Sequence, residues 1–243
     1  MRVATFNIHH GTVAKTGPVD PDRLGEVCAG FDADVLALQE VDLGTYRTGR
    51  ADLTAAVARA CAMTSVFGPS RRFPGGWYGN SLLVRGDIES WSVTPLPRVP
   101  RWRWWQERRT VLQASIRVGG VPLAVAGTHL AVPQSVNGVQ LDRVLELASH
   151  RPHPLVVMGD FNRFPSTVEP ASLAAGLTYV SHGPTSPVPG RRIVIDHVLV
   201  SPDVRVLGAE VRSTEMSDHA ALLVDLEISS DPDGPGAIAG VRR

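Results

Sequence analysis

The stretch "VVMGDFNRFPS", residues 156–166, is an apolar run that ends in a cluster of polar residues. Its β-branched start predicts a buried strand that ends near Gly159. Because side chains two residues apart on extended chain share a face, Asp160 and Asn162 are expected to point together, with Phe161 facing the core. Asp and Asn after a strand also commonly form a plain turn by bonding nearby backbone. The rest of the sequence has to distinguish a turn from a site.

The composition is that of a packed soluble domain. Of 243 residues, 43% are hydrophobic and 20% are charged. The formal net charge is +0 and the isoelectric point is about 7.1, so a general attraction to nucleic acid or anionic membrane would need a local patch. Cys28 and Cys61 lie among helix-forming apolar residues, which favours buried free thiols over a disulfide framework.

Strand and helix patterns alternate in the first half of the chain, and strands predominate in the second. Helices are expected at 20–31, 51–62 and 139–149, and strands at 3–8, 34–40, 81–84, 88–93, 111–118, 122–128, 155–158, 193–200 and 220–228. The pair Gly119-Gly120 between two apolar runs predicts a hairpin. This mixed order favours one α/β domain with at least one mixed sheet.

The domain is expected to span residues 1–228. The segment 229–243, "SSDPDGPGAIAGVRR", is rich in Pro and Gly and predicts a disordered tail. The first residues, "MRVATFNI", read as a strand and not as a charged-then-apolar leader, and no apolar run has membrane length. We therefore expect a cytoplasmic protein, with no obligate protein partner.

Acidic, amide and imidazole side chains collect at the ends of the predicted strands. They are Asn7 (with His9 and His10 just beyond), Glu40, His129, Asp160, Asn162, Asp196, Asp218 and His219. One such residue alone is explained by a turn, but repeated burial of polar groups at strand ends is unfavourable unless they share a purpose. Carboxylate and amide oxygens without cysteine favour Mg²⁺ or Mn²⁺, and imidazoles suit proton transfer or stabilisation of phosphoryl charge. The pattern indicates metal-assisted hydrolysis of a phosphoester.

Seven motifs carry a resemblance to a known family. "TFNIHHG", "LQEVD", "YGNSLLV", "GTHL", "GDFNRFP", "IDHVLVS" and "SDHAAL" resemble, in order, the motifs of the endonuclease/exonuclease/phosphatase superfamily, which includes deoxyribonuclease I. The matching pieces spread over residues 1–228. The resemblance implies a fold of the α/β (α+β) class, a four-layer α/β/β/α sandwich of two packed mixed β-sheets.

The resemblance also implies roles for the residues at the strand ends. Glu40 resembles the principal metal ligand, helped by Asn7 and Asp218, and the metal is expected to be Mg²⁺ or Mn²⁺. Asp160 would orient or deprotonate the attacking water, and Asn162 would hold that water or a phosphate oxygen.

Two histidines complete the implied catalytic set. His219, steadied by Asp196, would contact the phosphoryl oxygens, and His129 would stabilise or protonate the leaving group. Nuclease members place a carboxylate beside the histidine that matches His129, often near the position of Tyr78 to Asn80, and this sequence has no acid there.

Substrate binding is implied at two further positions. Arg109 in "ERRTVL" resembles a phosphate-binding arginine, with Arg108 as an equal neighbour, and Asn80 is expected to line the same pocket. The substrate is expected to be a small or lipid-derived phosphoester, because the chain is neutral and phosphate contacts dominate affinity for DNA. The alternatives are a DNA or RNA nuclease, and an inactive phosphate-binding module of the same fold.

The segment "RVPRWRWWQERR", residues 98–109, concentrates basic and aromatic residues between two strands. Trp102, Trp104 and Trp105 could enter a lipid surface or stack on nucleic acid bases. A rim loop with half-buried Trp and solvated Arg explains the same composition.

Overall fold

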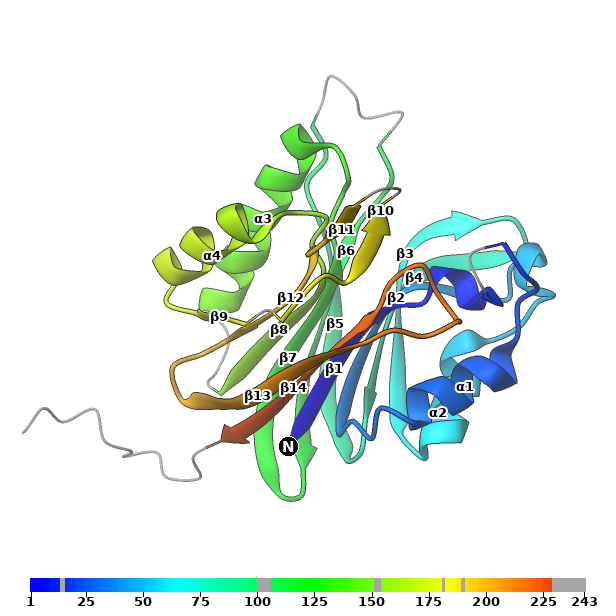
Figure 1. Ribbon diagram of the computed structural model, residues 1–243, viewed down its shortest axis with the longest axis horizontal. Helices are drawn as coiled ribbons and strands as arrows, with labels where there is room; N and C mark the ends of the chain where they lie inside the picture. Colours follow the sequence, from blue (N-terminus) through cyan, green and yellow to red (C-terminus); the bar gives the residue numbers. More distant parts are fainter. Residues whose placement is uncertain (14–15, 100–105, 151–153, 181, 189–190, 229–243) are drawn as a thin grey trace, which may run out of the picture.

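The protein is described by a computed structural model that covers residues 1–13, 16–99, 106–150, 154–180, 182–188 and 191–228. Two six-stranded β-sheets pack face to face, and a pair of helices covers the outer side of each sheet (Figure 1). The predicted four-layer α/β/β/α sandwich is therefore confirmed. The predicted disordered tail, 229–243, lies outside the described residues.

The first sheet combines strands from the two ends of the described chain. Its strands, in order across the sheet, are β13 (Val204–Arg212), β14 (Ala221–Ile228), β1 (Arg2–Asn7), β2 (Val35–Leu43), β4 (Gly76–Val84) and β3 (Thr64–Phe73). Only the pair β1 and β2 is parallel among these neighbours, so the sheet is mixed. Helices α1 (Pro21–Ala29) and α2 (Leu53–Cys61) cover it (Figure 1).

The second sheet is formed by the middle of the chain. Its strands, in order, are β5 (Asp87–Pro95), β6 (Thr110–Val118), β7 (Val121–His129), β8 (Leu155–Asp160), β12 (Asp196–Val200) and β9 (Thr178–Val180). Here β7 and β8 are the parallel pair. Helices α3 (Gln134–Ser149) and α4 (Pro165–Ala174) cover this sheet, and β10 (Ser186–Val188) pairs with β11 (Arg191–Ile193) separately.

Alternating side chains explain why the central strands are apolar throughout. In β2, Val35 and Ala37 enter the core between the sheets, whereas Leu36 and Leu38 enter the core beneath α1 and α2. Both faces of such a strand are buried, so a continuous apolar run is required. Phe161, predicted to face the core, is fully buried in the cluster beneath α3 and α4.

The smaller predictions are confirmed in part. Gly119 and Gly120 have positive φ angles of 55° and 86° and join β6 to β7 in the predicted hairpin. The two cysteines are free thiols, as expected. The predicted strand 193–200 is wrong in its extent, because β11 ends at Ile193 and β12 begins at Asp196. Helix α3 begins five residues before the predicted start at residue 139.

Four strands, namely β3, β9, β10 and β13, and one α-helix of the described chain were not predicted from the sequence. Strands β3 and β13 are the two edges of the first sheet, where half-exposed and charged side chains replace the regular apolar alternation. Strand β9 has only three residues. Helix α4 contains Pro170 in its interior and lacks a clear apolar stripe.

Candidate active site

The predicted site residues meet at one edge of the sandwich because of the strand directions. The parallel strands β1 and β2 end there, as do β7 and β8 in the other sheet. Strands β12 and β14 are antiparallel to these neighbours, so they begin at the same edge. The residues brought to this edge are Asn7, Glu40, His129, Asp160, Asp196, Asp218 and His219.

Asp160 lies at the centre of the site, and its two carboxylate oxygens have different partners. Oδ1 accepts a hydrogen bond from the backbone N–H of Asn162 at 2.8 Å, which forms a turn. Oδ2 accepts a hydrogen bond from Nδ2 of Asn7 at 3.0 Å and lies 3.4 Å from Nε2 of His129 and 3.9 Å from Nε2 of His219. One oxygen therefore forms the expected turn, and the other faces the polar side chains that meet at this edge.

The backbone around Asp160 explains how its carboxylate reaches this place. Gly159 has a φ of 154°, and a Cβ at this residue would lie 2.0 Å from the carbonyl oxygen of Thr128. Only glycine allows β8 to approach β7 so closely at this point. Asn162 adopts a left-handed φ of 48°, and its Nδ2 lies 3.1 Å from Nε2 of His129. This bend, and not strand alternation, brings the side chains of Asp160 and Asn162 to the same ring.

The pKa of Asp160 is raised to about 7. Burial is the main cause, and the nearby carboxylate of Asp196 adds to the shift. A carboxyl group with this pKa can accept a proton at neutral pH, which is the property of a general base.

His219 and Asp196 form an ion pair in which Nδ1 lies 2.9 Å from Oδ2. Burial alone would lower the pKa of His219, but the charge and hydrogen bond of Asp196 outweigh this effect and raise the pKa to about 10. The ring is therefore an imidazolium at neutral pH, with both nitrogens as donors. Its Nε2 faces Asp160.

His129 has an arginine as its partner where nuclease relatives are expected to have a carboxylate. Nη1 of Arg109 lies 2.8 Å from Nδ1 of His129, and because arginine is only a donor, Nδ1 accepts this bond. Burial, and then the charge of Arg109, lower the pKa of His129 well below its usual value. The neutral ring then carries its proton on Nε2, which lies 3.4 Å from Oδ2 of Asp160, so its contact with Nδ2 of Asn162 is not a hydrogen bond.

Glu40 is turned into the site by a bulge in β2. The pairing with β4 shifts register between Leu38 and Val41, and Glu40 itself has a left-handed φ of 58°. Its Oε1 accepts a hydrogen bond from Nδ2 of Asn7 at 3.1 Å, and its Oε2 lies 3.4 Å from Nε2 of His10. The same amide nitrogen of Asn7 thus contacts the carboxylates of Glu40 and Asp160.

A support behind Glu40 was missed by sequence reasoning. Arg47 donates from Nη1 to Nε2 of His10 at 3.0 Å, and its other nitrogens hold both oxygens of the buried Asp42 at 2.6 and 2.7 Å. Burial is the main cause that lowers the pKa of His10, so this ring is neutral. A buried acid in "LQEVD" was a signal that a cationic partner exists, but nothing in the sequence placed Arg47 there.

The remaining predicted residues lie around this centre. Arg109 is buried and reaches His129, whereas Arg108 is exposed, so the structure distinguishes the two neighbours. Asn80 is buried between the sheets and donates to the carbonyl oxygen of Thr110 at 3.4 Å. Asp218 lines a cavity of about 110 Å³ at the start of β14.

Within the described part of the chain, one group of side chains has metal-ligating atoms within 4.8 Å of one another, namely Asp160, Asp196 and His219. A protonated imidazole has no lone pair for a metal, and Asp196 holds His219 in that form. This group therefore fits an ion pair better than a cation site. The ligands expected from the sequence, Glu40 and Asp218, lie outside it.

A four-layer sandwich with carboxylates, amides and imidazoles at one edge is the arrangement of a class of phosphoester hydrolases. The sequence profile of the Endonuclease/Exonuclease/phosphatase family matches residues 4–219, and the chain belongs to this family. Its members are hydrolases that act on phosphoesters and generally depend on divalent metals. No curated protein gives a significant sequence match to the chain.

Several solved structures share the fold. An endonuclease/exonuclease/phosphatase from Beutenbergia cavernae is 24% identical with a TM-score of 0.77, over 94% of this chain and 71% of that one. The mannosyl-6-phosphatase Bt3783 of Bacteroides thetaiotaomicron is 17% identical with a TM-score of 0.69, over 94% and 100%. The catalytic domain of human Nocturnin is 18% identical with a TM-score of 0.70, over 94% and 93%.

Proposed function

We propose that this protein is a metal-dependent phosphoester hydrolase that uses Mg²⁺ or Mn²⁺ and acts on a small or lipid-derived phosphoester. One observation carries the proposal. A buried carboxylate, Asp160, faces an amide, a neutral imidazole and an imidazolium, contributed by Asn7, His129 and His219. Such a set combines a proton acceptor with donors for phosphoryl oxygens.

The residues present fit a divalent cation next to Glu40. This carboxylate is one-fifth exposed, and its described contacts are an amide nitrogen and the neutral ring of His10, so it has room for a cation that would balance its charge. Carboxylate and amide oxygens are the ligands that Mg²⁺ prefers, and a cation here requires the amide of Asn7 to turn, because its Nδ2 faces Glu40 and its Oδ1 accepts the N–H of His9. We propose that Glu40, Asn7 and Asp218 hold the ion, which supplies positive charge to the phosphate when it is bound.

The other residues then divide the work. Asp160 accepts the proton of the attacking water, and Asn162 positions that water or a phosphate oxygen. His219, held as an imidazolium by Asp196, donates to the phosphoryl oxygens.

His129 faces the leaving group in this proposal. Because Arg109 occupies Nδ1, the ring offers the Nε2–H as a hydrogen-bond donor and not a cationic acid. This geometry supports stabilisation of the leaving oxygen over its protonation.

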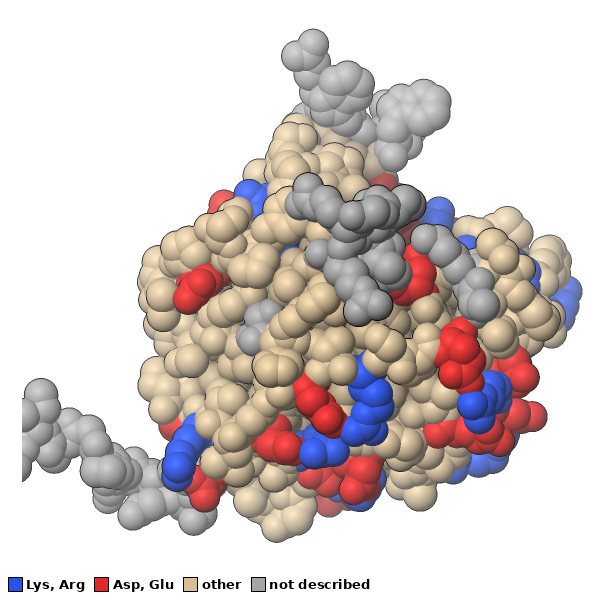
Figure 2. All heavy atoms as spheres, in the orientation of Figure 1, with Lys and Arg blue, Asp and Glu red and all other residues tan. Residues whose placement is uncertain are grey.

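The choice of substrate class rests on charge. Figure 2 shows acidic and basic side chains close together on the visible face, without a broad area of one sign, and the formal net charge is +0. A neutral surface supports a small ester over a nucleic acid, whose binding needs several phosphate contacts. The mannosyl-6-phosphatase that shares the fold makes a polar phosphoester a competing outcome, and a DNA or RNA nuclease is the other alternative.

The proposed cytoplasmic location and the proposed contact with a lipid surface are two further predictions. Trp102, Trp104 and Trp105 lie outside the described residues, so their contact with a lipid surface stays a prediction. In the described part of the chain, no helix combines the length and apolarity needed to cross a membrane.

A substrate screen tests the proposal. Purified protein is incubated with Mg²⁺, with Mn²⁺ or with EDTA, and with plasmid DNA, RNA, sphingomyelin, phosphoinositides and bis-p-nitrophenyl phosphate. The expected result is metal-dependent release of product from a small or lipid ester. Cleavage of DNA or RNA alone would establish the nuclease alternative, and binding without turnover would establish the inactive module.

A further inference from the structure

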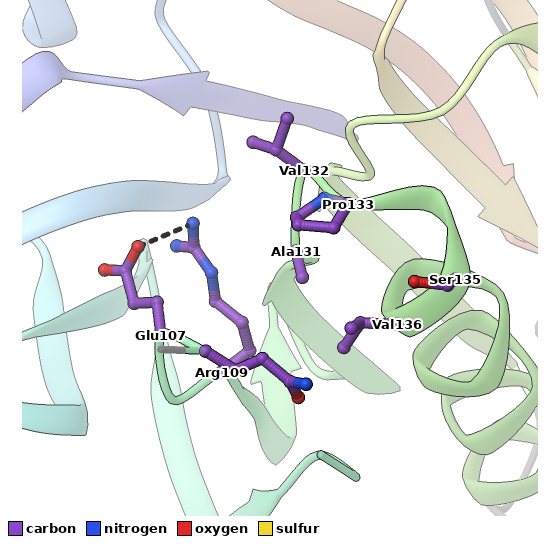
Figure 3. Close-up of a pocket in the computed structure, with 8 residues that line it drawn as sticks. Glu107, Arg109, Ala131, Val132, Pro133, Ser135 and Val136 are labelled. Atoms are coloured by element: carbon purple, nitrogen blue, oxygen red, sulfur yellow. Dashed lines mark ion pairs between the residues drawn. The ribbon is translucent and has the colours of Figure 1, made fainter. Parts of the chain in front are cut away.

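A cavity of about 400 Å³ is lined in part by Arg109 (Figure 3), whose guanidinium contacts His129. One wall is made by the segment that follows β7 and opens α3, and the opposite wall by the segment that precedes β6. The lining residues are Gln106, Glu107, Arg109, Ala131, Val132, Pro133, Ser135 and Val136.

The two walls differ in chemistry. The wall after β7 is mainly hydrocarbon, since Ala131, Val132, Pro133 and Val136 face the space in Figure 3. The opposite wall carries an ion pair between Arg109 and Glu107, whose Nη2 and Oε2 atoms are 3.1 Å apart. The charges cancel locally, so the cavity favours an uncharged, largely apolar group.

Arg109 links the cavity to the proposed leaving-group side of the site. Arg109 lines the cavity and also donates to Nδ1 of His129 at 2.8 Å. Ala131 follows His129 by two residues, and Nδ2 of Asn162 bonds to the carbonyl oxygen of the intervening Leu130 at 3.0 Å. We infer that a group attached to an oxygen beside His129 can extend past Arg109 into this cavity.

Arg109 also has a donor left over. Its side chain is 6% exposed, and its Nε is buried with no hydrogen-bond partner within the described part of the chain. A buried donor of this kind is unfavourable unless a ligand or water accepts from it.

We propose that this cavity binds the apolar part of the alcohol that leaves during hydrolysis. The inference rests on the proposed function and narrows it to phosphoesters whose alcohol carries an alkyl or aryl group of several carbons. A sugar or nucleoside alcohol fits this space poorly, because its hydroxyl groups would lose water against a hydrocarbon wall.

Binding of alkylphosphonates tests the proposal without requiring turnover. Methyl-, butyl- and hexylphosphonate are titrated into the full chain in Mg²⁺, and heat is measured by calorimetry. Each buried methylene is expected to tighten binding by about fourfold until the cavity is filled. Equal affinities across the series would overturn the proposal.

Two matched variants test whether the alkyl chain of the phosphonate binds in this cavity. Val132 and Val139 are both exposed, at 63% and 46%, but only Val132 lines the cavity. Val132→Asp is expected to bring the affinities for hexylphosphonate and methylphosphonate close to each other, because a charge at the rim opposes burial of the alkyl chain. Val139→Asp is expected to leave this ratio unchanged. A preserved ratio in Val132→Asp would show that the chain binds elsewhere and would overturn the proposal.

The design separates the two levels of inference. If the wild type binds no phosphonate and hydrolyses no ester in the substrate screen, the proposed function fails and the cavity proposal fails with it. If methylphosphonate binds and esters are hydrolysed, but chain length has no effect on affinity, the cavity proposal alone is wrong.

Discussion

Asp196 and His219 share one short contact of 2.9 Å, and the other carboxylate oxygen of Asp196 is buried with no hydrogen-bond partner within the described part of the chain. The charge of this fully buried acid is therefore balanced mainly through one ring. The two side chains come from strands of different sheets or their flanks, so the pair also joins the two halves of the sandwich.

We expect Asp196 and His219 to act as one unit in catalysis. Asp196→Asn keeps the shape but removes the charge that holds His219 as an imidazolium, so turnover should fall by about 10²–10⁴-fold. Groups that act as a unit are not additive. The double variant Asp196→Asn/His219→Ala should therefore be little worse than His219→Ala alone.

The measurement is kcat/KM for the four proteins on one soluble ester. Asp225→Asn is the matched control, because Asp225 pairs with Arg2 in the partly exposed part of β14, outside the residues that form the site. Losses that multiply independently across the four proteins would contradict the idea of a unit.

Glu40→Gln is expected to weaken binding of the metal ion and to remove most of the metal-dependent activity. The amide keeps the size of the side chain but lacks the negative charge that attracts the cation, so turnover should fall by about 100-fold or more. Calorimetric titration with Mn²⁺ should show weaker binding. Glu26→Gln on the exposed face of α1 is the control, and equal Mn²⁺ affinity in both variants would rule out Glu40 as a ligand.

The stability of the metal-free protein should fall as the pH rises. The folded-state pKa of His219, about 10, lies above the ordinary histidine value of 6.5, so its stabilising contribution is complete below pH 6.5 and is lost as the pH rises through about 10. The pKa of Asp160 is raised from 3.8 to about 7, so this group also makes the free energy of unfolding fall as the pH rises, but over a lower pH range. Between about pH 7 and about pH 8.5, below the range of the thiols, the free energy of unfolding should fall by up to about 1.4 kcal/mol per pH unit.

Urea denaturation in EDTA at several pH values measures this slope. His219→Gln removes the titrating ring, so its unfolding free energy should fall less steeply with pH in the same interval, where Asp160 still titrates. An equal slope in the wild type and in this variant would show that another group titrates.

Gly159→Ala should destabilise the fold far more than an alanine at another glycine of positive φ. The new Cβ would meet the carbonyl oxygen of Thr128 at 2.0 Å, and overpacking of this kind costs about 1–3 kcal/mol beyond the backbone strain. Gly119→Ala, where nothing lies within 4 Å of the Cβ, is the control for the strain alone. Chemical denaturation compares the two, and equal losses would mean that β7 and β8 can separate at this point.

The fold and the residues at the centre of the candidate site could be predicted from the sequence, because both depend on local patterns. Asn7, Glu40 and Asp160 each follow an apolar run, and parallel strands bring such ends together. The edge strands β3 and β13 were missed because their exposed faces carry no periodic apolar signal.

The supporting contacts were beyond the sequence for a different reason. The contact of Arg47 with His10 depends on a left-handed backbone at His10 and on a turn before α2, and neither leaves a clear sequence mark. Arg109 could not be distinguished from Arg108, because that choice depends on which of two adjacent side chains points inward.

The pairing of β1 with β14 has a consequence for biosynthesis. Met1 and Leu226, which are joined by backbone hydrogen bonds, are separated by 225 residues. During translation, β1 therefore leaves the ribosome long before its partner exists, and the strand that follows His219 arrives last among the described elements. We therefore expect a nascent or prematurely terminated chain that lacks His219 and this strand to be inactive.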